Sequence, residues 1–129
     1  MNKKYFKKII AQSPKDLEVI SALSAGSKVK ISDIKYLPKN KIFLLSINRK
    51  QKENNDQLIN SIIKFSFIDS CKSQNIDQKN INKTIELITI NIFKKNNNYQ
   101  ISLFFSGNSC ISLQSEIIDA ELVDQNKIG

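Results

Sequence analysis

The sequence predicts an α+β, mostly β domain: a bent antiparallel sheet or small barrel of about seven strands with one N-terminal helix. Three observations lead to this prediction. Apolar and polar residues alternate over several short segments, which is the period of a half-buried strand. Short turn sequences join these segments, and strands joined by tight turns are antiparallel. Only one stretch has clear helical spacing. The 129 residues have the size of one domain, so we expect a single unit over residues 1–129.

The helix is expected between Ser13 and Gly26. Ser13 can cap the free N–H groups of the first turn, Pro14 suits the first helical position, and Asp16 faces the positive end of the helix dipole. Gly26 can end the helix in a left-handed conformation. The apolar residues that recur at helical spacing are Leu17, Ile20 and Leu23.

Strands are expected wherever alternation is clear, and polar stretches at residues 49–57 and 70–84 are expected to be loops. The alternation slips by one residue at Asp33, which predicts a β-bulge. The segment from Ile111 to Leu122 predicts one long bulged strand, with a C-terminal helix from Glu116 as the alternative, and a frayed tail at about 124–129. The other expected strands are residues 5–11, 29–36, 42–47, 63–67, 85–93 and 99–105.

The sequence has no constellation for a familiar enzyme chemistry. It has no histidine, which removes the commonest general base and metal ligand. Its three glycines are far apart, so no phosphate-binding loop is present. Cys71 and Cys110 are isolated and are expected to be free thiols. We therefore predict a non-enzymatic protein without a cofactor or a metal, which acts by binding a protein partner or a second copy of itself.

Basic charge is the one candidate functional signal. The net charge of +8 divides into +9 for residues 1–50, +2 for residues 51–100 and −3 for the rest. This asymmetry suggests nucleic-acid or anionic-surface binding as the alternative function. It is not favoured, because only one basic residue is arginine and the chain is rich in Lys, Asn and Ile throughout. The possible anion or partner contacts are Lys3, Lys4, Lys7, Lys8 and Arg49.

No apolar run is long enough to span a membrane, and the basic N-terminal segment lacks the apolar core of a signal peptide. We therefore expect a cytoplasmic protein.

Several segments, in order along the chain, resemble a bacterial family known as domain of unknown function 2948. The matching segments are residues 16–22 (DLEVISA), 29–38 (VKISDIKYLP), 41–49 (KIFLLSINR), 105–107 (FSG) and 111–122 (ISLQSEIIDAEL). The resemblance implies a single-domain cytoplasmic protein of unassigned function and brings no catalytic residues. The positions it singles out are Asp33, Tyr36, Pro38, Asn48 and Arg49. For Arg49 we expect a structural ion pair, with Glu53 or Asp33, in preference to an anion site.

Overall fold

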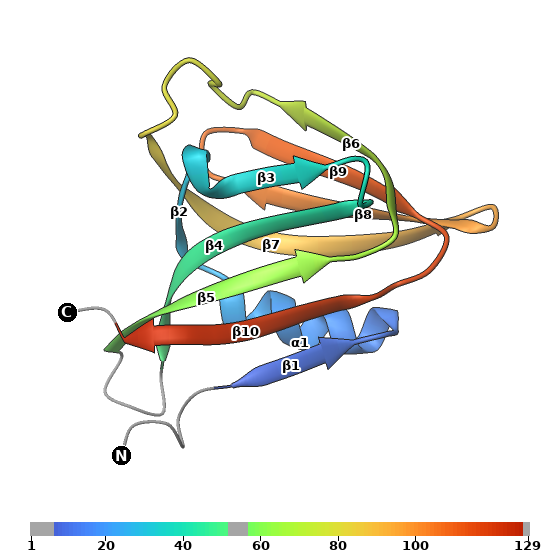
Figure 1. Ribbon diagram of the computed structural model, residues 1–129, viewed down its shortest axis with the longest axis horizontal. Helices are drawn as coiled ribbons and strands as arrows, with labels where there is room; N and C mark the ends of the chain where they lie inside the picture. Colours follow the sequence, from blue (N-terminus) through green and yellow to red (C-terminus); the bar gives the residue numbers. More distant parts are fainter. Residues whose placement is uncertain (1–6, 52–56, 128–129) are drawn as a thin grey trace.

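The protein folds into one ten-stranded antiparallel sheet with an α-helix packed against it (Figure 1). The computed structural model describes residues 7–51 and 57–127. The elements, in chain order, are β1 (Lys8–Ala11), α1 (Pro14–Ser24), β2 (Lys28–Lys30), the 3₁₀ turn η2 (Ile31–Asp33), β3 (Ile34–Leu37), β4 (Ile42–Gln51), β5 (Gln57–Phe65), β6 (Ile68–Gln74), β7 (Thr84–Lys95), β8 (Asn98–Phe105), β9 (Ser109–Ser115) and β10 (Ala120–Lys127). The predicted fold class is confirmed.

The strand order leaves the sheet open, with β1 and β6 as its edges. The hydrogen-bonded order is β1-β10-β5-β4-β2-β7-β8-β9-β6, and β3 pairs with β4 outside this path. All pairings are antiparallel. Hairpin connections explain much of this order, because a tight turn places consecutive strands side by side.

Two corners at the same end of the sheet fold it over on itself (Figure 1). The chain turns between β5 and β6 and again between β9 and β10, and the four strands pair on both sides of the bend. Phe65 pairs with Ala120 before the corner, and Ile68 pairs with Ser115 after it. Phe67 lies in the corner with a left-handed φ of 60°. The bend brings the inner faces of the two halves together around the core.

The core consists of the apolar side chains on the inner faces of the folded sheet together with one face of α1. Leu17 and Ile20 of α1 are buried against it. Ser13 caps the helix as predicted, because its Oγ accepts a hydrogen bond from the Asp16 N–H at 3.1 Å. The buried apolar residues of the sheet include Val29, Phe43, Leu45, Ile47, Ile63, Phe65, Leu87, Ile101, Leu103, Leu113 and Leu122.

The structure corrects the predicted number of strands from about seven to ten. β6 lies in a stretch that was predicted to be a loop, because it is polar on both faces and its pattern does not alternate. The segment from Ile111 to Leu122 is two strands joined by a corner, neither one long strand nor a helix. Each half pairs with different neighbours, which a sequence pattern does not reveal.

Three smaller expectations are also corrected. The phase slip near Asp33 is a 3₁₀ turn and not a β-bulge. The predicted loop at residues 49–57 is shorter, since β4 continues to Gln51 and β5 begins at Gln57. The frayed tail predicted from residue 124 is wrong for residues 124–127, which belong to β10 and pair with β5.

α1 is docked on β7 by a serine, which gives the first testable prediction. Ser21 Oγ accepts the backbone N–H of Ile90 at 3.0 Å. Ser21→Ala leaves this N–H without its acceptor, so we expect a loss of about 1–3 kcal/mol in the free energy of unfolding, measured by urea denaturation. Ser24→Ala is the control: the Ser24 hydroxyl is buried but donates only to carbonyl groups of its own helix, those of Ile20 and Ser21. Its expected effect is within about 0.5 kcal/mol. Equal effects of the two substitutions would contradict the docking role.

Candidate functional site

Arg49 lies on β4 at a position that the strand period assigns to the core. Side chains of a strand alternate between its two faces, and Leu45, Ile47 and Arg49 follow each other at this spacing. The first two are fully buried, and the exposed fraction of Arg49 is only 1%. The strand therefore takes the guanidinium inside the molecule, where a charge needs a partner.

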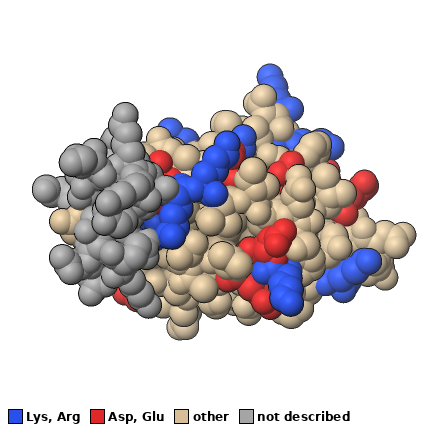
Figure 2. Space-filling model, turned by 90° about the horizontal axis from the view of Figure 1, so that it is seen from below, with Lys and Arg blue, Asp and Glu red and all other residues tan. Residues whose placement is uncertain are grey.

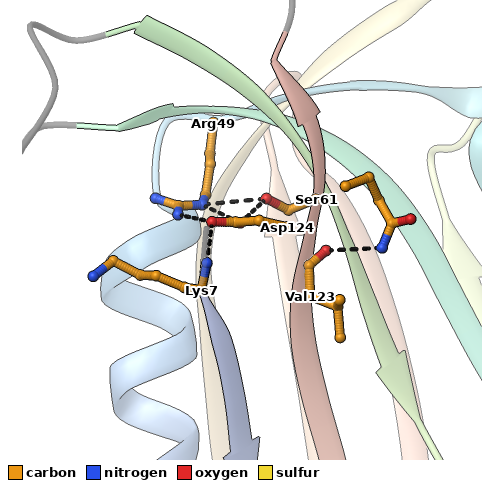
Figure 3. A network of polar contacts seen from close by, with 6 residues as sticks. Lys7, Arg49, Ser61, Val123 and Asp124 are labelled. Carbon is orange, nitrogen blue, oxygen red and sulfur yellow. Dashed lines mark hydrogen bonds and ion pairs between the residues drawn. The ribbon is translucent and has the colours of Figure 1, made fainter. Parts of the chain in front are cut away.

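The partner is Asp124 of β10 (Figure 3). Arg49 Nη2 donates to Asp124 Oδ2 at 2.7 Å, and Arg49 Nε donates to Asp124 Oδ1 at 3.1 Å. Both side chains are essentially inaccessible to solvent. Two parallel N–H···O bonds between a guanidinium and a carboxylate are the strongest geometry for such a pair.

Two further groups complete the coordination of the Asp124 carboxylate. Ser61 Oγ of β5 donates to Oδ1 at 2.6 Å, and the backbone N–H of Lys7 donates to Oδ2 at 2.8 Å. The Asp124 N–H donates in return to Lys7 O at 2.9 Å. We call Arg49, Asp124, Ser61 and Lys7 the buried polar network. It joins β4, β5 and β10 to the residue that precedes β1.

The guanidinium of Arg49 has more donors than this network uses. An arginine has about five N–H donors in a fixed planar arrangement. One on Nε and one on Nη2 point to Asp124, and Nε also contacts Ser61 Oγ at 3.2 Å. Nη1 has no hydrogen-bond partner among the described residues and points away from the carboxylate, toward the C-terminal end of α1 (Figure 3). Arg49 is one of the residues that line a cavity of about 480 Å³ at this end of β4.

The predicted contact residues that the structure describes, Lys7, Lys8 and Arg49, do not form one exposed cationic site. Arg49 is buried in an ion pair, as expected, but with Asp124 in place of Glu53 or Asp33. Lys7 joins the network through its backbone, and Lys8 is exposed on β1. Lys3, Lys4 and Glu53 lie outside the described residues.

Two other lysines of the basic half form ion pairs with acidic side chains. Lys28 pairs with Glu86 and Lys41 with Asp69, both at 3.1 Å. The face in Figure 2 shows basic and acidic side chains interspersed.

The edge strand β6 has a hollow on each of its faces. The inner hollow, of about 490 Å³, opens between β3 and β6 and reaches core side chains such as Phe43 and Ile111. The outer hollow, of about 450 Å³, is lined by polar side chains of β6, β8 and β9. Cys71 lines the inner hollow and Cys110 the outer one, and both are free thiols as expected. Burial raises the pKa of the Cys71 thiol, which favours its protonated form.

Asp124 and Ser61 are the residues of the network that sequence reasoning missed. The available signal was period-two spacing: Ala120, Leu122 and Asp124 are all buried on one face of β10. An acidic residue in phase with two apolar ones predicts a buried carboxylate, provided that the strand extends far enough. Over residues 7–51 and 57–127, no cluster of His, Cys, Asp and Glu could hold a metal ion. The described part of the chain also has no helix long and apolar enough to cross a membrane.

The network yields a prediction about stability. Asp124→Asn or Arg49→Met leaves one charge or dipole buried without its partner, so each should lower the free energy of unfolding by about 3–5 kcal/mol. The double variant Arg49→Met/Asp124→Leu removes both polar groups and should be more stable than either single variant. Denaturant unfolding of all three proteins measures this. Additive losses in the double variant would show that the two side chains do not act as a pair.

Comparison with known proteins identifies the family of this chain. A search of functionally curated proteins finds no match. Among solved structures, the crystal structure of an uncharacterized protein from Neisseria gonorrhoeae matches with 14% sequence identity and a TM-score of 0.47. The match covers 88% of this chain and 96% of that one. The model of the protein family of unknown function DUF2948 matches residues 7–128. The chain therefore belongs to the DUF2948 family.

Proposed function

We propose that this protein is a non-enzymatic binding domain that holds an extended segment of a protein partner against the free edge of β6. The supporting observation is the pair of hollows that flank this edge strand. An edge strand presents unpaired N–H and C=O groups, to which another strand can add. β9 is the only strand that pairs with β6 among the described residues.

The gap between β3 and β6 is where such a segment would lie. Only the first two residues of β6 have contacts on this side. Ile68 N–H donates to Lys41 O at 2.8 Å, Tyr36 Oη donates to Ile68 O at 3.4 Å, and Asp69 forms an ion pair with Lys41. Beyond Ile68, no hydrogen bond joins β3 and β6 within the described parts of the chain. The two strands diverge from this point (Figure 1), and the inner hollow opens between them.

The two hollows specify the chemistry of the partner. Successive side chains of a strand point to opposite faces, so a strand beside β6 would place alternate side chains into the inner and the outer hollow. The inner hollow has no charged lining residue and many isoleucines, and it therefore suits apolar side chains. The outer hollow is lined by serines, glutamines and Lys72 and suits polar or acidic ones. The expected partner segment alternates between these two kinds.

Nucleic-acid binding through the lysines of the first half has less support. Lys28 and Lys41 are in ion pairs, and the lone arginine is buried. The absence of histidine from the sequence supports a non-enzymatic role, because it leaves few routes to general base or nucleophilic catalysis.

Each hollow is lined by one of the two cysteines, so the alkylation rate of each thiol measures whether a peptide covers that hollow. This allows a direct test of the proposal. Short random peptides displayed on phage are selected against the protein, and an enriched peptide is synthesised. Alkylation of Cys71 and Cys110 by iodoacetamide is then followed by mass spectrometry with and without it. Mildly alkaline pH is used because the raised pKa of Cys71 slows its reaction at neutral pH. We expect an alternating peptide that slows alkylation of both cysteines several-fold.

Two variants provide the control. Ser73 lines both hollows, so Ser73→Arg should abolish peptide binding. Asn91→Arg adds the same side chain at an exposed position of β7 and should leave binding unchanged. Protection of both thiols in the protein alone, together with a dimer mass in sedimentation, would identify the partner as a second copy. Selected peptides that leave both thiols reactive, or no selected peptides, would overturn the proposal.

A further inference from the structure

The outer face of the part of the sheet formed by β3, β4, β5 and β10 has apolar side chains, where an antiparallel sheet that faces solvent commonly has polar ones (Figure 1). Along these strands, inward-facing residues alternate with residues that are more exposed and point away from the core. Several of the outward-facing residues are aliphatic, and each of the four strands contributes at least one. We call them the outer stripe: Leu37 of β3, Ile42 and Leu44 of β4, Ile62 of β5 and Val123 of β10.

The strand register places the outer stripe diagonally across the sheet. Leu37 pairs with Ile42 at one end, and Ile62 pairs with both Ser46 and Val123 at the other. The two ends are therefore separated by the width from β3 to β10 and by the length of β4 from Ile42 to Ser46. With a strand spacing of roughly 4.8 Å and a rise of roughly 3.3 Å per residue, the stripe is about 20 Å long.

Lysines border the outer stripe on both sides and at one end. The cross-strand neighbours of Leu44 are Lys35 of β3 on one side and Lys64 of β5 on the other. Lys8 of β1 pairs with Val123 at the end of the stripe. The face is therefore apolar along its centre and basic along its borders.

Most of this border charge is uncompensated. Lys64 forms an ion pair with Glu121 at 3.5 Å. Lys8 and Lys35 are exposed, and neither has an ion-pair partner within residues 7–51 and 57–127. Complementary charge across an interface favours an acidic partner for such a face. A second copy of the chain fits less well, because it would bring two basic borders together.

We propose that the outer stripe is a docking surface for an amphipathic α-helix of a partner protein, with acidic residues on both sides of the helix's apolar face. A helix rises 1.5 Å per residue, so about 14 residues cover the length of the stripe. A sheet and a helix pack in layers because each buries its apolar face against the other. An anionic bilayer fits less well, since the stripe lies flat between lysines, whereas apolar groups at a membrane surface are buried roughly 5–10 Å deep.

This docking surface is separate from the β6 edge. Lys35 and Leu37 lie on the opposite side of β3 from Ile34 and Tyr36, which line the inner hollow. A helix on the outer stripe and an extended segment beside β6 would therefore contact different faces of the sheet.

A phage library of helical peptides tests the chemistry of the occupant. Each peptide has about 14 residues, with leucines fixed at helical spacing and random residues beside them. Selection against the whole protein should enrich Asp and Glu beside the leucines, because these positions would face Lys35 and Lys64. An enriched peptide, synthesised with a fluorophore, should bind saturably in fluorescence anisotropy and shift the NMR amide signals of β3, β4, β5 and β10. A library without binders, or enrichment of Lys and Arg, would overturn the proposal.

Two matched pairs of variants locate the binding. Lys35→Glu should weaken peptide binding on the order of tenfold, because it reverses a charge beside the stripe. Lys95→Glu, at the exposed end of β7, makes the same change in net charge and should leave the affinity unchanged. Leu44→Ser should abolish binding, whereas Leu58→Ser, at an exposed position of β5 beyond the stripe, should not.

Equal effects within either pair would overturn the proposal. It would also be overturned by a dimer in sedimentation that Leu44→Ser dissociates, or by binding to anionic phospholipid vesicles without binding to any peptide. Ser73→Arg at the β6 edge should leave binding of the helical peptide unchanged, since Ser73 lines only the two hollows beside β6. Loss of binding in this variant would show that the peptide occupies the β6 edge and not the outer stripe.

Discussion

The buried pair of Arg49 and Asp124 is the interaction on which the arrangement of the chain depends most. It joins residues 75 positions apart, and the hydrogen bond from the Lys7 N–H to the Asp124 carboxylate spans 117 positions. The order of the sheet places β10 between β1 and β5, so both ends of the described chain meet at this carboxylate. When the chain folds, bringing residues so far apart in the sequence together costs conformational entropy. The network therefore joins strands that are far apart in the sequence and does not stabilise any single local element.

The same strand, β4, connects the buried polar network to the inner hollow beside β6. Phe43 near its start lines this hollow, and Arg49 near its end belongs to the network. Between them β4 pairs with β5 along its full length, so it is a rigid part of the sheet. The proposed partner site at the unpaired edge of β6 lies at the other end of β4 from the network.

The sequence predicted the elements whose two faces differ and missed those whose faces are alike. α1 had a cap, a proline and helical spacing, and β8 alternates, so local patterns were sufficient. β6 is polar on both faces because it is an edge strand. The sequence pattern predicted one long strand in place of β9 and β10. The corner between them also contains apolar residues, so the pattern shows no break there. Arg49 was singled out correctly, but its partner was not, since pairing between β4, β5 and β10 determines which residues meet.

Native-state hydrogen exchange tests most directly whether the buried polar network locks the ends of the chain to the core. The Lys7 and Asp124 amides bond to each other's residues within the network. If the network holds both ends, these amides exchange only through global unfolding, with the same free energy as amides of core strand residues such as Leu45 and Ile63. Exchange of the Lys7 and Asp124 amides through local opening, while the core amides stay protected, would contradict this account.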